Sequence, residues 1–432
     1  MIRMMIVILG LLCTGCASSI LSERGTYLRA YHQGAFCQAE EKLDYLIQQE
    51  LPKECYTRSK EASWLLLDRA MTHFVMGKTE EAIKDFHLAL ESLDYYQQEI
   101  ALERFTQVLL QDEQGAYQAS DFEQVLARLY FAFALLQEGD EGNAYALLRQ
   151  AEEYQQEKQA LYARRPLTKH YRLNENALSR YVFAALLEKR QDESNAQLLY
   201  QQIDPSRLPL ERTARDKATI LVISHTGKAP YKISTTCPAT QASLIALEML
   251  LSTKRHPAAL SSLPGIPVPA LQEWPYPSPA LICAKVDGQP KPLIPFYDVK
   301  QAAWQDLQQQ RPNLIARGVA RFLLRRATVD YMQQQDPDLG ALVDLTMYCI
   351  NRETRADTRS WTTLPAEIAL TRFDVEPGQH HFQAYIEDPA HPIRTSCYTL
   401  NLQSQDLCII HIFNIHPAVN RLLIPERFLK IP

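Results

Sequence analysis

The residues best equipped for chemistry in this 432-residue chain stand together in the segment Asp-Thr-Arg-Ser-Trp-Thr-Thr-Leu-Pro, residues 357–365. Asp357 and Arg359 can form an ion pair or cap a neighbouring element, and Trp361 can bury its ring while its indole N–H donates a hydrogen bond. Two interpretations are open. We favour an ordered loop held against a sheet; the alternative is a ligand site in which Arg359 and Trp361, beside Asp357, make the contacts.

Other chemistry-bearing residues do not fall into a catalytic pattern. The sequence has no G-x-S-x-G or H-E-x-x-H motif, and Gly227-Lys228 lacks the upstream glycine of a phosphate-binding loop. Asp336 and Asp338 are too ordinary a pair to indicate a glycosidase. Five histidines gather near the end of the chain: His380, His381, His391, His411 and His416. Because His380 and His381 are neighbours on a strand and point to opposite faces, we expect no metal site here. Since no catalytic motif occurs, we also expect no catalytic residue and no cofactor.

The first sixteen residues predict export. Arg3 precedes an apolar run from Met4 to Leu12, and Cys13-Thr14-Gly15-Cys16 follows. A basic start, a short apolar core and small residues at the cut are typical of a secretory signal peptide, here residues 1–15. The apolar run is much shorter than the roughly 20 residues that span a bilayer as a helix.

The cut before Cys16 resembles the lipobox of bacterial lipoproteins, although Cys13 stands where leucine is usual. The resemblance implies an acylated Cys16 followed by a short tether, residues 16–21, and two or more acyl chains hold a protein firmly on a membrane. Ala17 and the serines after it resemble enteric lipoproteins sent to the periplasmic face of the outer membrane. The alternative is a secreted protein with an incidental cysteine.

Composition is that of an ordinary globular protein, with 46% hydrophobic and 22% charged residues. A net charge of -5 gives no basic footprint for nucleic acid. Seven of the nine cysteines remain once Cys13 is removed and Cys16 is modified. None of them forms a C-x-x-C pair, so we expect most to be buried structural residues.

Residues 22–203 predict an array of helices, because apolar residues recur at steps of three and four and proline is almost absent. A frame recurs around Gly34, Gly77, Gly139 and Gln191. An alanine lies seven positions before the turn in three units, and Tyr27 takes this small-residue position in the unit at Gly34. In each unit an alanine lies five positions after the turn, and a Leu, Phe or Tyr lies four residues further on. This frame resembles the tetratricopeptide family, with turns 43, 62 and 52 residues apart instead of a steady 34. A generic helical bundle is the alternative.

Residues 204–216 read as a linker and residues 217–432 as an α+β domain with a mainly antiparallel sheet. We expect strands at these ranges: Lys217–His225, Tyr231–Ser234, Ala280–Val286, Lys291–Phe296, Ile368–Phe373, His381–Ile386, Cys397–Leu402 and Leu407–Ile415. Gln241–Leu251 predicts a helix, and the proline-rich Pro257–Pro279 an extended segment. Val299–Gln334 predicts a long helix broken at Pro312, whose arginines we place on a solvated face.

The segment 357–365 also suggests a family. Together with the lipobox, Gly227-Lys228-Ala229-Pro230, Val286-Asp287-Gly288 and Ile315-Ala316-Arg317, it resembles an uncharacterised family of bacterial lipoproteins. Their front half is tetratricopeptide-like and their back half contains β-structure. The resemblance implies a membrane-anchored, non-enzymatic adaptor whose array binds an envelope protein. The alternative function is a module in the second half that binds or acts on cell-wall material.

Overall fold

The computed structural model describes residues 18–50, 61–98, 116–164, 173–208, 216–236, 266–274, 281–387, 393–394, 396–416 and 419–430. The signal peptide, Cys16, the helix expected at Gln241–Leu251 and most of the expected linker lie outside these residues. No described helix is both long enough and apolar enough to cross a membrane. Paired helices followed by a mixed region with mostly antiparallel sheets confirm the predicted fold class.

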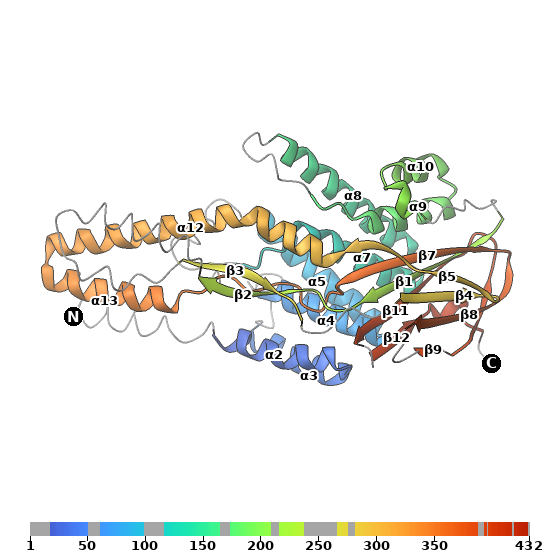
Figure 1. Ribbon diagram of the computed structural model, residues 1–432, viewed down its shortest axis with the longest axis horizontal. Coiled ribbons are helices and arrows are strands. Elements are labelled where there is room, and N and C mark those ends of the chain that lie inside the picture. Colours follow the sequence, from blue (N-terminus) through green and yellow to red (C-terminus); the bar gives the residue numbers. More distant parts are fainter. Residues whose placement is uncertain are drawn as a thin grey trace.

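The array consists of helix pairs joined by tight turns (Figure 1). Its helices are α2 (Ser18–His32), α3 (Phe36–Glu50), α4 (Ala62–Met76), α5 (Thr79–Gln98), α7 (Asp121–Glu138), α8 (Glu141–Ala163), α9 (Ala177–Lys189) and α10 (Glu193–Gln201). The first begins at Ser18, inside the stretch expected to be a tether.

The recurring frame of the sequence corresponds to the turns and close approaches of these pairs. Gly34, Gly77, Gly139 and Gln191 all have positive φ, which is the conformation that ends a helix in a left-handed residue. The alanines five residues later, Ala39, Ala82, Ala144 and Ala196, are buried. Small side chains at these positions let the two helices of each pair approach closely.

The second half is a two-layer β-sandwich. The first sheet has the order β12-β11-β1-β7-β6, and the second has β10-β8-β4-β5 with β9 paired to β8. Their bounds are β1 (Ala218–Thr226), β4 (Leu281–Val286), β5 (Gln289–Pro292), β6 (Ile294–Asp298), β7 (Glu367–Val375), β8 (Gly378–Glu387), β9 (Ile393–Arg394), β10 (Tyr398–Leu402), β11 (Leu407–His416) and β12 (Val419–Leu423). Neighbouring strands run antiparallel except β1 and β11, which are parallel.

The first sheet is buried on both faces, so the molecule has three layers. Leu221 and Ile223 of β1 belong to the core that the sheet shares with the helices. Ile220 and Val222 of the same strand belong to the core between the two sheets, opposite Phe382 of β8. The array therefore covers one face of the sandwich, and the two halves share one hydrophobic core.

A helical hairpin projects from this body. It consists of α12 (Val299–Gln335) and α13 (Pro337–Glu353), and Figure 1 shows it extending away from the sandwich. A ribbon of β2 (Tyr231–Thr236) and β3 (Pro267–Gln272) lies against α12. The strand β3 is the described part of the expected proline-rich extended segment.

Two expectations for this hairpin are wrong. The helix α12 continues through Pro312, because Pro312 and Gln308 are exposed and water can solvate the carbonyl that proline frees. The arginine face is not simply solvated. Arg321 is buried, Arg325 donates to Thr354 Oγ1, and burial with the charge of Arg321 lowers the pKa of Arg325 to about 10.

The close helix approach generates a stability prediction. Leucine in place of Ala82 forces extra atoms between α4 and α5, and we expect the free energy of unfolding to fall by about 1–3 kcal/mol. The matched control is Ala341→Leu on the exposed surface of α13, which should change it by less than about 0.5 kcal/mol. Urea denaturation measures both. Equal effects of the two substitutions would contradict the packing assigned to Ala82.

Candidate functional site

The segment singled out by its chemistry lies between the helical array and the sandwich. Residues 354–366, here called the clasp segment, link the end of α13 to the start of β7 without regular secondary structure. Arg359 and Trp361 are 3% and 1% exposed. Neither side chain presents a surface to another molecule in this conformation, and both are held by residues of the array.

Asp68 of α4 is the centre of this attachment. Its Oδ1 accepts from the N–H groups of Thr362 and Thr363, both at 3.0 Å, and from Thr363 Oγ1 at 2.9 Å. Its Oδ2 accepts from Thr362 Oγ1 at 2.8 Å and from Tyr27 OH at 2.7 Å. Burial raises the pKa of Asp68, whereas the Tyr27 hydroxyl and the nearby charge of Arg24 act in the opposite direction.

Other array residues bind the backbone of the clasp segment. Arg24 of α2 donates to the carbonyl oxygen of Thr358 at 2.6 Å and to Ser360 Oγ at 2.9 Å. Glu123 of α7 accepts from the N–H of Trp361 at 2.9 Å. Side chains from three helices thus satisfy peptide groups of one irregular segment of chain. Helical arrays hold a bound peptide in the same way, but here the peptide belongs to the protein itself.

Arg359 forms the charged end of the clasp segment. Its guanidinium pairs with Asp357 Oδ2 at 2.8 Å and with Glu61 Oε1 at 2.7 Å, and Glu61 also accepts from Trp64 Nε1. Although burial acts to raise it, the adjacent Arg359 holds the pKa of Asp357 below its usual value. The three residues predicted as interaction contacts are therefore close together, and their described partners are residues of this chain.

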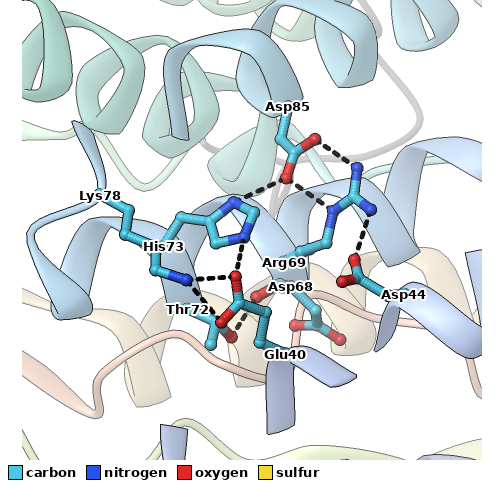
Figure 2. A network of polar contacts seen from close by, with 8 residues as sticks. All are labelled: Glu40, Asp44, Asp68, Arg69, Thr72, His73, Lys78 and Asp85. Atoms are coloured by element: carbon cyan, nitrogen blue, oxygen red, sulfur yellow. Dashed lines mark hydrogen bonds and ion pairs between the residues drawn. The ribbon is translucent and has the colours of Figure 1, made fainter. Parts of the chain in front are cut away.

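A second polar cluster joins α3, α4 and α5 (Figure 2). The ring of His73 lies between Glu40 Oε1 and Asp85 Oδ2, each 3.1 Å from a ring nitrogen. Arg69 bridges Asp85 at 2.6 Å and Asp44 at 2.7 Å. Partial burial acts to raise the pKa of Glu40, but hydrogen bonding to Lys78 and the nearby His73 hold it below its usual value. These contacts tie three helices together.

The third cluster is a chain of buried rings between the array and the first sheet. Tyr130 OH lies 2.8 Å from His225 Nδ1, and His225 Nε2 lies 3.0 Å from His411 Nδ1. Phe133 packs on His411 with its ring centre 4.7 Å away. Burial lowers the pKa of His225 well below the usual value and that of His411 to about 3. Both rings are therefore neutral in the folded protein at pH 7.

The described side chains of His380, His381 and His411 are not brought together, and His391 lies outside the described residues. His411 faces the array, whereas His380 lies in the other sheet, 2.6 Å from Asp287 Oδ2, and His381 is exposed beside it. The described residues contain no group of three or more His, Cys, Asp or Glu side chains arranged to hold a metal ion. Cys283 and Cys408 are buried, and Cys37 and Cys397 are exposed.

The residues that hold the clasp segment were missed in the sequence, yet two carried a signal. Asp68 is a lone carboxylate after the apolar run Trp64-Leu65-Leu66-Leu67. Glu123 stands three residues after Ser120, the spacing of a capping box, and it accepts from the Ser120 N–H at 2.7 Å. Comparison with family models and with curated proteins gave no match for this chain.

The attachment at Asp68 generates the second prediction. Asp68→Ala leaves five buried donors without their acceptor, so we expect the free energy of unfolding to fall by at least about 3 kcal/mol. Hydrogen exchange of the Thr362 and Thr363 amides should also become faster.

Asp44→Ala is the matched control, because Asp44 makes one ion pair, with Arg69, and its side chain is 43% exposed. Its loss should cost less than about 1 kcal/mol. If both alanine variants lose the same stability in urea denaturation, Asp68 is not the centre of the attachment.

The buried histidines generate the third prediction. Because the folded-state pKa of His411 lies below the ordinary 6.5, the unfolded chain binds a proton that the folded protein does not. The contribution of neutral His411 to the free energy of unfolding is therefore fully present above pH 6.5 and is lost as the pH falls toward 3. Each pH unit costs about 1.4 kcal/mol for such a histidine.

His411→Asn keeps a hydrogen-bonding partner for His225 and removes this titration, so the variant should lose less stability between pH 6.5 and pH 4.5 than the unaltered protein. His381→Asn, on the exposed face of β8, is the control and should keep the original slope. Urea denaturation at a series of pH values gives both slopes. Identical slopes for all three proteins would contradict the assignment.

Proposed function

We propose that this protein is a membrane-anchored lipoprotein that acts as a non-enzymatic scaffold on the periplasmic side of the outer membrane. An acyl group at Cys16 would anchor it, and the array would bind an envelope protein. The observation that carries the proposal is the attachment of Arg24 to the clasp segment.

This attachment supports an anchoring role because of its place in the chain. Arg24 follows Cys16 by eight residues, a distance of at most about 29 Å even when fully extended. The guanidinium of Arg24 donates a hydrogen bond to the clasp segment, which leads into β7. The helix α2, which carries Arg24, packs on α3. A lipid at Cys16 would therefore hold both halves close to the membrane as one body.

The packing of the array on the sandwich also restricts where on the array a partner can bind. One face of the array is covered by the first sheet and the clasp segment, so that face has no room for a partner. Large apolar side chains remain exposed elsewhere on the array: Tyr45 of α3, Leu161 of α8 and Leu198 of α10. Exposed aromatic and aliphatic residues are the usual anchors of protein interfaces.

Deleting the array is a poor test, because the deletion exposes the apolar face of the first sheet that the helices cover. Surface substitutions avoid this. We expect the combined variant Tyr45→Ser, Leu161→Ser and Leu198→Ser to lose at least about tenfold of the captured partner in crosslinking from envelope extracts. The matched control carries Tyr331→Ser and Leu345→Ser on the projecting hairpin, residues that are equally exposed. Equal capture by the two variants would assign the partner to another surface.

Anchoring is tested separately. Radiolabelled palmitate should enter the unaltered protein and the variant Cys37→Ser, whose cysteine is exposed on α3. It should not enter Cys16→Ser, and that variant should leave the membrane fraction. Equal labelling of the two variants would remove the lipid anchor from the proposal.

A further inference from the structure

A polar pocket lies where the last helix pair meets the edge of the sandwich. It has a volume of about 200 Å³ and is lined by α9, α10, the start of β1, the end of β7 and the turn between β10 and β11. Figure 1 shows α9 and α10 beside this end of the first sheet. Neither the clasp segment nor the exposed apolar residues of the array belong to it.

The floor of the pocket is fixed by Arg372 of β7. Its guanidinium is buried and pairs with Glu188 Oε2 of α9 at 2.8 Å and with Asp374 Oδ1 at 2.9 Å. It also donates to Tyr200 OH at 3.2 Å and to Thr219 Oγ1 at 3.3 Å. Residues of both halves are thus held in one hydrogen-bonded layer, which gives the pocket a rigid polar base.

The rim carries an unusual pair of residues. Gln191 and Gln405 have φ values of 64° and 66°, and they are two of the three described non-glycine residues with positive φ. The third, Asp287, precedes Gly288 in a hairpin turn outside the pocket. Glycine adopts this conformation with less strain, so a glutamine at both rim positions indicates a use for the side-chain amide. Gln197 of α10 adds a third amide.

The charges of the lining are balanced. The lining holds the cations Lys189, Lys217 and Arg372 and the anions Glu188, Glu193 and Asp406. Lys189 pairs with Glu141 and Arg372 with Glu188, so we assign Lys217, Glu193 and Asp406 to the ligand. The ammonium of Lys217 lies 3.5 Å from Glu376, whose side chain is 72% exposed. Because so exposed an ion pair contributes little stability, a ligand carboxylate can replace Glu376 at low cost. Amides with charges of both signs match a ligand that itself carries amide, ammonium and carboxylate groups.

We propose that this pocket binds a short peptide with free ends, of about the size of a dipeptide. The volume is below the roughly 300–1,000 Å³ that is usual for drug-sized ligands, which limits the occupant to a small molecule. Lys217 binds the carboxylate, the acidic rim residues bind the ammonium, and the glutamines bind the peptide group. The site is independent of lipid anchoring and of partner capture.

Isothermal titration of the detergent-solubilised full chain with L-alanyl-L-alanine tests the proposal. We expect a Kd below about 1 mM, and no binding of the same dipeptide with acetylated and amidated ends. Lys217→Ala should weaken binding by about tenfold or more, because a charge-assisted hydrogen bond is lost. Gln405→Gly should weaken binding as well while leaving the melting temperature unchanged or higher, since glycine accepts the positive φ.

Asp287→Gly is the matched control, because it makes the same exchange at a positive-φ residue outside the pocket, and it should bind the dipeptide normally. Four outcomes would overturn the proposal. They are no binding up to about 10 mM dipeptide, equal binding of the blocked dipeptide, unchanged affinity in Lys217→Ala and Gln405→Gly, and tighter binding of the neutral polyol sorbitol than of the dipeptide.

Discussion

One buried carboxylate joins the two halves of this molecule. Asp68 has no exposed surface, and both of its oxygens are used in accepting five hydrogen bonds, four of them from the clasp segment. A carboxylate in that environment is tolerated only because its donors replace the water it has lost. The position of the clasp segment, and with it the path of the chain from α13 to β7, depends on that replacement.

A hydrophobic core shared by the two halves adds stability to the attachment at Asp68. The helices and the first sheet contribute to one core, in which Phe74 of α4 packs on Phe413 of β11 with ring centres 5.7 Å apart. Burial of such rings supplies stability without specifying orientation, because the hydrophobic effect is non-directional. The polar chain from Tyr130 through His225 to His411 adds direction within the same interface, since each hydrogen bond fixes an angle as well as a distance.

The helical frame was readable from the sequence because it depends on local geometry. A left-handed residue at each turn and a small residue at each close approach recur at fixed offsets, and Gly77 with Ala82 shows both. Alternation also placed β1, β7, β10 and β11 within two residues of their observed bounds, whereas β8 begins three residues earlier than expected. The α13 helix and β12 were missed, because α13 begins at a proline directly after a long helix and β12 is short.

The attachment between the halves could not be read in the same way. Arg24 and Thr358 are 334 residues apart in the chain, and no local pattern predicts which helix a distant loop will meet. The sequence identified Asp357, Arg359 and Trp361 as unusual. In the structure all three are at least partly buried, and their polar groups form hydrogen bonds or ion pairs with other residues of the chain. It could not distinguish a segment that binds another molecule from one that is bound by its own chain, because both need the same residue types.

The parallel pairing of β1 with β11 sets the order in which this protein can fold. Thr219 lies beside Leu407, so the central strand of the first sheet acquires that neighbour only after nearly all of the chain has been made. Contacts so distant in sequence close slowly, since the loop entropy must be lost before they form. Until then the apolar residues of β1 remain exposed to unwanted association. A polypeptide with this topology is therefore prone to aggregate while its synthesis is incomplete.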